Sequence, residues 1–563
     1  MGASPVTGSL ALVLHAHLPF VRHPAHDDFL EERWLFEVVV GCHVPLLWVL
    51  EGWERDGVPG GWTMSISPTL AAMLSDPLLR SRVGRHLERW ERLARDEEER
   101  QTLRPAWQRV ASFHRQRLAR VRQTWEALGG DLLGAWRAWE RAGRIHLMTC
   151  GATHALLSLL SELPWAMRAQ VDTAVREHRR HFGCPPRGFW LPECAYAPAV
   201  EPALRGAGIE WTVLETHGLL GARPAPARGV LAPIRTPGGL TCFGRDPTSA
   251  RQVWSRDVGY PGDPRYREFH RDVADDAEWS YVEPHAAGTG HRVPTGLKMH
   301  RVTGASGEKE PYDPDAALAA VGEHARHFVE ARLRWLAGRA DRGEPVGHGM
   351  PTSPAPLIVA PYDAELFGHW WMEGPAFIDA VAREARLRGL GLVSLADHPA
   401  WSRGAHVARP AASSWGEGGH LGVWLDASNA WMQRPLRSMN LRLARWLDAA
   451  RQSGPAGRRA GDAAAMTRDR CLRQAAREWM LAWASDWPFL IRMNTARAYA
   501  ESRFRSHVGR FDRLEAMAHG REGIDPSWLG MVEAEDNLFP EIDPASWLGR
   551  DEPEQGVGRP PHD

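Results

Sequence analysis

The sequence is poor in lysine, in net charge and in long apolar runs. Lysine occurs only at Lys298 and Lys309, and arginine supplies nearly all of the basic charge. The formal net charge is −1, with a pI near 7.2, so no overall field attracts nucleic acid or an anionic membrane. No apolar run reaches the ~20 residues that a membrane-spanning helix needs. We therefore expect no nucleic-acid partner, no membrane partner and a neutral substrate.

Cysteine is also scarce. The six cysteines are scattered, without a CxxC pair or a dense framework that would predict disulfides or a thiolate metal site. The chain does not start with a charged segment followed by a long apolar one, as a secretory signal does. These features favour a cytoplasmic protein with free thiols, present as a monomer or a small homo-oligomer.

Tryptophan, in contrast, is abundant. There are 27 Trp against 15 Phe and 7 Tyr. An indole ring offers a broad apolar face and one N–H donor, which suits a protein core and also the C–H faces of sugar rings. Abundance alone does not separate these two uses.

Short apolar runs alternate with amphipathic stretches along most of the chain. The runs are nearly continuous rather than alternating, which is typical of buried parallel strands. They cover 10–14, 63–66, 145–149, 188–191, 211–214, 357–360 and 391–395. Helical patterns lie between them, at about 78–127, 165–182, 314–336 and 374–387. A chain of 563 residues with this alternation favours a parallel α/β barrel over a small open sheet.

Other stretches break the pattern. Residues 197–235 are rich in Pro, Gly and Ala and predict an inserted domain, and residues 243–311 predict long functional loops. We therefore divide the chain into a barrel (1–196 and 236–410), the insertion (197–235), a helical domain (411–535) and a partly disordered tail (536–563). The segment GPAGRRAGDAAA is expected to be a mobile connection inside the helical domain.

Polar residues follow several of the predicted strands. The strands lead into HAHLPF, CGATHA, PECAY and PYDAE. In parallel α/β folds the loops after the strand carboxyl ends build the active site. His15 and His17 are two residues apart, so both side chains point to one side of a strand. They suit either a zinc site or the binding of sugar hydroxyls; because further zinc ligands are lacking, we favour sugar binding.

Two carboxylates occupy equivalent places after different strands. Glu193 follows Pro192 in GFWLPECAY and has Trp190 nearby, and Asp363 is the first acid of APYDAELFGHWWMEGP. Glu365 and Glu373, further along, are expected to be supporting residues. Paired carboxylates are the signature of glycosidic-bond chemistry: one attacks the anomeric carbon, and the other protonates the leaving oxygen. We predict that Glu193 is the nucleophile and Asp363 the acid/base.

Five motifs, in order, carry a resemblance to a known family. HAHLPF, CGATHA, GFWLPECAY, APYDAELFGHWWMEGP and SSWGEGGHLGVWLD resemble the signature regions of glycoside hydrolase family 57. REWMLAWASDWPFLI resembles the helical domain of that family's 1,4-α-glucan branching enzymes, so the resemblance extends over residues 9–530. It implies an incomplete TIM-like (β/α)7 barrel with a small inserted domain and an all-α C-terminal domain. It also implies a retaining mechanism without a metal or other cofactor, acting on α-glucans such as amylose, amylopectin and glycogen.

The same resemblance assigns the candidate site residues. It is consistent with Glu193 as nucleophile and Asp363 as acid/base. The further residues that we expect to bind substrate are His15, His17, His154, Trp34, Trp190, Trp279, Trp415, Trp424 and Asp486. Trp415 and Trp424 could also pack between the barrel and the helical domain.

The expected reaction is the transfer of an α-1,4-glucan segment to a C6 hydroxyl, which forms an α-1,6 branch. An α-amylase or a 4-α-glucanotransferase shares both carboxylates, and a non-catalytic glucan-binding protein is the rival from another class. A tyrosine at the tip of the loop 243–262 is associated with branching in this family. The only tyrosine in that loop is Tyr260, near its end, so the sequence leaves hydrolysis open.

Overall fold

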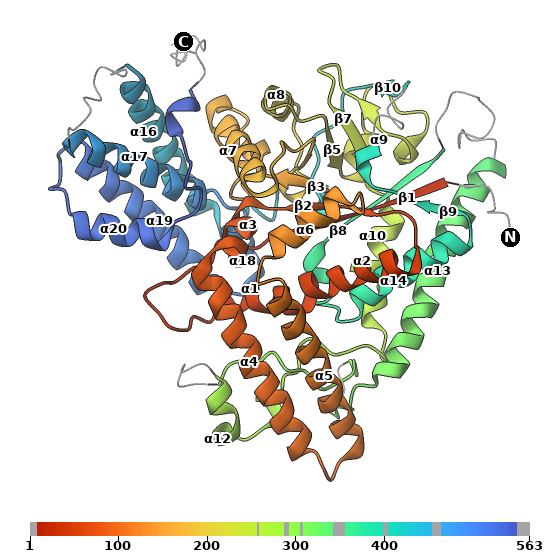
Figure 1. Ribbon diagram of the computed structural model, residues 1–563. Helices are drawn as coiled ribbons and strands as arrows, with labels where there is room; N and C mark the ends of the chain where they lie inside the picture. The colour runs from red at the N-terminus through yellow and green to blue at the C-terminus, as the bar shows by residue number, and fades with distance from the viewer. Residues whose placement is uncertain are drawn as a thin grey trace.

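The computed structural model describes residues 8–255, 258–286, 292–304, 308–341, 355–397, 404–452 and 463–548. A parallel sheet lies at the centre, with helices on both sides, and a group of helices from the C-terminal third lies at one end of it (Figure 1). Of the predicted connection, 454–465, residues 454–462 lie outside the described residues, as does the end of the predicted tail, 549–563; residues 463–465 are helical.

Seven parallel strands form the barrel. They are β1 (Gly8–Ala16), β2 (Trp62–Ile66), β3 (Ile145–Cys150), β4 (Gly188–Trp190), β5 (Trp211–Leu214), β7 (Thr241–Gly244) and β8 (Leu357–Asp363). They run in the order β7-β5-β4-β3-β2-β1-β8. At the two ends of this order, Arg245 forms a parallel bridge with Val359, and the Asp246 N–H donates to the Val359 carbonyl at 2.8 Å. The closure of the ring through this single bridge fits the expected incomplete (β/α)7 barrel.

Two features of the fold differ from the predictions: the position of one barrel strand and the bounds of the inserted domain. β7 was not predicted; the predicted strand at 391–395 is instead the short β9 (Leu390–Leu392), which pairs only with the start of β1. The predicted insertion 197–235 contains β5, which pairs in parallel with β4 and β7 and therefore belongs to the barrel. The added structure is smaller: α9 (Thr216–Leu220), a 3-10 turn at Gly229–Leu231, and β6 (Ile234–Arg235) with its partner β10 (His406–Val407).

Helices cover the barrel. Three of them lie where the amphipathic patterns predicted a helix: α7 (Pro164–Phe182), α13 (Pro314–Asp341) and α14 (Gly374–Leu387). Four others were not predicted: α3 (Pro68–Ser75), α6 (Leu132–Arg141), α8 (Glu201–Gly206) and α10 (Pro247–Trp254). The stretch predicted as helical over 78–127 forms two helices, α4 (Pro77–Arg100) and α5 (Pro105–Ala127), which pack together and extend away from the sheet (Figure 1). Pro105 causes the break, because it starts the second helix well but cannot continue the first.

Residues 32–56 form one continuous helical stretch near the N-terminus. It consists of α1 (Glu32–Val38), a π-helical turn (Val39–His43) and α2 (Val44–Asp56). By length and composition alone this stretch could cross a membrane, but 83% of its most apolar window is buried inside the protein. A core helix passes the same test, and this stretch packs against α4, α5 and α14.

The C-terminal helices form a second layer against the carboxyl ends of the strands. They are α16 (Gln433–Gln452), α17 (Ala463–Ala482), α18 (Asp486–Met493), α19 (Arg497–Ala518) and α20 (Pro526–Glu535). Asn440 accepts hydrogen bonds from the indole N–H groups of Trp479 and Trp483, and both rings are buried in the core of this domain. The chain stays packed beyond the predicted boundary at 535, because Phe539 and Trp547 are buried. The described part of the predicted tail, 536–548, therefore belongs to this domain.

Two short helices lie apart from both layers. They are α11 (Val273–Asp276) and α12 (Trp279–Val282), in the long connection between β7 and α13. The 3-10 turn that follows α12, Glu283–His285, packs against α4.

Candidate active site

Glu193 lies in a sharp turn directly after β4. Its backbone is left-handed, with φ 60° and ψ 25°, and the next residue, Cys194, also has a positive φ of 49°. His154, in the loop after β3, has φ 56°. Non-glycine residues adopt this conformation rarely and at a cost, and such strain gathers at functional sites. Three strained residues on adjacent strand ends therefore mark this edge of the barrel as the candidate site.

Trp415 holds the Glu193 carboxylate. Its indole Nε1 donates to Oε2 of Glu193 at 2.6 Å, and its backbone N–H donates to the Glu193 carbonyl at 2.9 Å. A hydrogen bond from an N–H group stabilises the ionised form of a carboxyl group. Of the two tryptophans predicted around SSWGEGG, Trp415 is thus the one that contacts the proposed nucleophile.

Asp363 ends β8, where it lies opposite His15 of β1 in the strand register. Burial raises its pKa to about 6, although His17 and Arg245 oppose this shift. Burial also raises the pKa of Glu193 to about 8; the Trp415 hydrogen bond counteracts the rise, and the charges of Asp363 and Asp486 add to it. Because the charge of Asp363 raises the pKa of Glu193, the two carboxyl groups titrate as a pair. The pair holds one proton between about pH 6 and pH 8.

One shared proton is what a retaining glycosidase needs. The attacking carboxyl group must be ionised and the other must carry the proton that goes to the leaving oxygen. With pKa values of about 8 for Glu193 and about 6 for Asp363, this proton resides on Glu193 in the free protein. The predicted roles require it on Asp363, and the Trp415 N–H, which stabilises a charge on Glu193, acts in that direction. The roles of Glu193 as nucleophile and Asp363 as acid/base stay predictions.

The three predicted histidines form one stack beside the carboxyl groups. The rings of His17 and His154 are 3.7 Å apart, and those of His15 and His154 are 5.0 Å apart. His15 Nε2 is hydrogen-bonded to His154 Nε2 at 2.9 Å, and His154 Nδ1 lies 3.8 Å from Oε1 of Glu193. The Nδ1 atoms of His15, His17 and His154 are hydrogen-bonded to the hydroxyl groups of Ser65, Ser67 and Ser485, respectively. Because the ring nitrogens already have partners, the arrangement suits a polar wall for a sugar better than a zinc site.

The helical domain closes the site from the opposite side. Asp486, the first residue of α18, accepts from Nε2 of His17 at 3.0 Å. Its neighbour Ser485 is hydrogen-bonded through Oγ to Nδ1 of His154 at 2.7 Å. Asp486 therefore holds His17 and acts electrostatically on Glu193; direct contact between Asp486 and substrate stays a prediction.

The other tryptophans that were predicted to bind substrate are more buried or lie farther from the carboxyl pair than Trp415 does. Trp190 is fully buried between His15 and Trp415, where its ring packs against both neighbours; its direct contact with substrate stays a prediction. Trp424 is only 2% exposed and packs beneath the turn at Gly416. Trp34 is half-buried and packs edge-on against Tyr499 of α19. For Trp424 and Trp34, contact with substrate stays a prediction.

Trp279 lies on α12, away from the carboxyl pair and the histidine stack. Its ring packs against the Arg292 guanidinium, with 5.9 Å to the ring centroid. The contacts in the described part of the chain do not join it to Glu193 or Asp363, so its predicted role in substrate binding stays a prediction.

The other acids and rings after β8 have supporting roles. Oε1 of Glu365 accepts from the His17 backbone N–H at 2.9 Å. Glu373 precedes α14, but its side chain does not cap that helix; it accepts from the Arg267 backbone N–H at 3.1 Å. Trp371 is buried in the core, whereas Trp370 is 53% exposed.

Two further residues of the site escaped the sequence analysis. Arg245 follows β7 and donates to Glu215, which follows β5, at 2.8 Å. The Arg245 guanidinium carbon lies 5.2 Å from the centroid of the Trp415 ring. A charged residue directly after the apolar run TCFG (241–244) was the available signal, but the second half of that run and Arg245 were assigned to the loops at 243–311.

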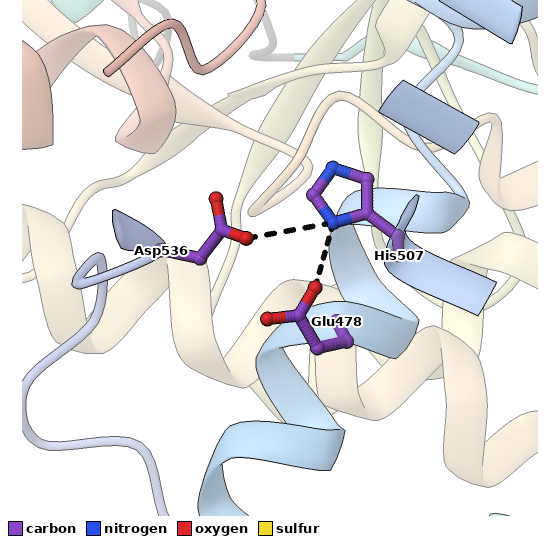
Figure 2. Close-up of side chains that lie close together, drawn as sticks. All are labelled: Glu478, His507 and Asp536. Carbon is purple, nitrogen blue, oxygen red and sulfur yellow. Dashed lines mark hydrogen bonds and ion pairs between the residues drawn. The ribbon is translucent and has the colours of Figure 1, made fainter. Parts of the chain in front are cut away.

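One group of side chains in the described residues has metal-ligand spacing, and it lies elsewhere. Glu478, His507 and Asp536 meet in the core of the helical domain (Figure 2). His507 Nδ1 lies 2.7 Å from Glu478 Oε2 and 3.7 Å from Asp536 Oδ2. Arg503 and Arg510 already form ion pairs with Asp536. Because these guanidinium groups supply the positive charge that a cation would bring, the group fits a buried charge network better than a metal site.

Comparisons with known proteins agree with this geometry. The model of glycosyl hydrolase family 57 matches residues 11–312, and that of the C-terminal domain of 1,4-alpha-glucan branching enzymes matches residues 456–547. The chain is 32% identical to the 1,4-alpha-glucan branching enzyme TK1436 of Thermococcus kodakarensis, over 97% of this chain and 79% of that protein.

Two solved structures are similar over nearly the whole chain. The α-amylase AmyC of Thermotoga maritima is 36% identical with a TM-score of 0.85, covering 96% of this chain and 99% of its own. A branching enzyme of Pyrococcus horikoshii is 30% identical with a TM-score of 0.83, covering 97% and 98%. The family match over more than half of the chain, with Glu193 near its middle, shows that this protein belongs to glycoside hydrolase family 57.

Proposed function

We propose that this protein is a 1,4-α-glucan branching enzyme that acts by a retaining mechanism. The observation that carries the chemistry is the pair Glu193 and Asp363, which share one proton near neutral pH at strand ends on one edge of the barrel. The C-terminal match to branching enzymes and the relative TK1436 support branching as the outcome. The substrate would be an α-glucan such as amylose, and the six free cysteines fit a cytoplasmic location.

Each residue would have one task in the reaction. Glu193 attacks the anomeric carbon while Asp363 gives its proton to the leaving O4, so the C–O bond breaks and a glycosyl ester forms on Glu193. The ionised Asp363 then takes the proton of an acceptor C6 hydroxyl, whose oxygen displaces Glu193. The product is an α-1,6 branch, and both carboxyl groups return to their starting states.

Hydrolysis is the second candidate, and two observations favour it. AmyC, one of the most similar solved structures, is an α-amylase. Tyr260, the only tyrosine of the loop 243–262, is 7% exposed and bonds through its hydroxyl to Nδ1 of His327 on α13 at 2.8 Å. It therefore belongs to the core and cannot shield an intermediate from water at a loop tip.

Incubation with amylose distinguishes the two reactions. Branching predicts falling iodine staining with few new reducing ends, and short chains that appear only after treatment with a debranching enzyme. Many new reducing ends would show an α-amylase instead. Unchanged amylose would contradict both enzyme assignments and leave a glucan-binding protein.

A further inference from the structure

Arg245 is fixed at the seam of the barrel. It is the first residue after β7 and forms the bridge to Val359 of β8 that closes the ring. Its Nη1 donates to Oε2 of Glu215, and the two side chains are only 11% and 14% exposed. An ion pair that is shielded in this way holds its geometry better than one on the surface. The guanidinium therefore has a defined place at the edge that carries both catalytic carboxyl groups.

One side chain, Trp415, links Arg245 to the proposed nucleophile Glu193. Its guanidinium packs on the indole of Trp415, and Nε1 of the same indole donates to Glu193. A cation near an aromatic ring attracts it and restrains its orientation. Trp415 is thereby held between the arginine and the carboxylate.

The charge of Arg245 also acts on Asp363, the proposed acid/base. The positive charges of His17 and Arg245 favour the ionised form of Asp363. The charge of Asp363 in turn raises the pKa of Glu193 and of Glu365. Nε of Arg245 is buried and has no hydrogen-bond partner among the described residues. A buried N–H group without a partner costs free energy, so its retention beside the catalytic pair points to a task in the reaction.

We propose that Arg245, anchored by Glu215, is a positioning residue for glycosidic-bond cleavage, which orients Trp415 towards Glu193 and presents its positive charge to Asp363. The inference rests on cleavage at this site, the step that branching and hydrolysis share. It does not depend on which acceptor, water or a sugar hydroxyl, completes the reaction.

The test measures kcat/KM on amylose against pH for Arg245→Gln, Arg245→Lys and Arg251→Gln, the last being an exposed control on α10. Loss of the positive charge raises the pKa of Asp363, so Arg245→Gln should move the acid limb of the profile up by about one pH unit. We expect a loss of roughly 10- to 100-fold in kcat/KM at pH 7, the range for one charged hydrogen-bonding or ion-pair partner. Arg245→Lys should restore the position of the limb but only part of the rate, because lysine keeps the charge without the planar group.

If kcat/KM fell equally in Arg245→Gln and Arg245→Lys and the acid limb of the pH profile stayed in place, the proposal would be overturned. Arg245 would then have a structural role. Thermal unfolding of each variant identifies one that fails to fold. In a double-mutant cycle, Trp415→Phe and Arg245→Gln should be non-additive, because both act through the same indole; additive effects would contradict the link through Trp415.

A readout without turnover completes the test. A carbodiimide with an amine modifies the protonated form of a carboxyl group, so mass spectrometry of the Asp363 peptide against pH reports its protonation. Arg245→Gln should extend this labelling to higher pH. An unchanged labelling profile would overturn the part of the proposal that concerns the charge of Arg245 at Asp363. A wild type that only hydrolyses amylose would refute branching and leave this inference intact. A wild type inert on every α-glucan would refute both.

Discussion

The indole Nε1 of Trp415 donates a hydrogen bond of 2.6 Å to Oε2 of Glu193, although 222 residues separate the two in the chain. A second hydrogen bond of 2.9 Å joins their backbones. The segment that leads into the helical domain therefore completes the turn after β4. The proposed nucleophile depends on both parts of the protein for its orientation and for its charge.

Trp415→Phe should weaken catalysis without unfolding the protein. Phenylalanine keeps an aromatic ring but removes the donor, and a hydrogen bond to a charged group contributes about 1.5–3 kcal/mol. We expect kcat/KM to fall roughly 10- to 100-fold. The control is Trp431→Phe, at a ring that is 37% exposed. Equal activity in the two variants would contradict the role of the indole N–H.

The activity profile should be bell-shaped. With pKa values of about 6 for Asp363 and about 8 for Glu193 in the free protein, the singly protonated pair is the active form. Below about pH 6 it gains a second proton, and above about pH 8 it loses the only one. Measurement of kcat/KM on amylose from pH 4 to 10 checks this. A flat profile across both limbs would refute the shared proton.

Asp486→Asn should move the alkaline limb to lower pH. The negative charge of Asp486 contributes to the raised pKa of Glu193, so its removal lets the pair lose its last proton earlier. Asparagine can still accept the hydrogen bond from His17, so thermal stability should change little. The same pH profile provides the measurement, and a limb that moves upward would contradict the sign of this interaction.

Glu193→Gln should abolish activity and yet stabilise the fold at alkaline pH. Burial raises the pKa of Glu193 from 4.5 to about 8, so the stability contributed by the neutral carboxyl is complete below pH 4.5 and is lost as the pH rises through 8. Glutamine stays neutral throughout. The variant should therefore melt at a higher temperature than wild type at pH 9 and at a similar temperature at pH 4.5.

The exposed Glu417→Gln serves as the control for this comparison. It should melt like wild type at both pH values. Melting of Glu193→Gln below wild type at pH 9 would show that the ionised carboxylate stabilises the fold, which is the opposite of what its burial predicts.

Most of the longer helices and most barrel strands were predictable because their signals are local. The continuous apolar runs at 145–149 and 211–214 identify buried strands on their own. β7 was missed because TCFG is short and lies beside two glycines at 238–239, which is the pattern of a turn. Its strand character comes from pairing with β5, which the sequence does not show.

Site residues could be predicted from the sequence where they directly follow a strand. They were harder to predict where segments far apart in the sequence come together. Glu193 and Asp363 could be assigned from their places after two apolar runs and from the family motifs. The burial of Trp190 could not, because alternation along a strand does not tell the inside of a barrel from its helix-covered outside. Arg245 and Ser485 join the site through contacts between elements far apart in the sequence.

The most direct test of the central claim, that Glu193 is the nucleophile, is to trap the intermediate. An activated fluorinated glucosyl donor forms the glycosyl ester quickly and releases it slowly, so the labelled protein can be digested and analysed by mass spectrometry. We expect a single glucosylated peptide, modified at Glu193 and absent from Glu193→Gln. A label on Asp363, or full cleavage of amylose by Glu193→Gln, would contradict the assignment.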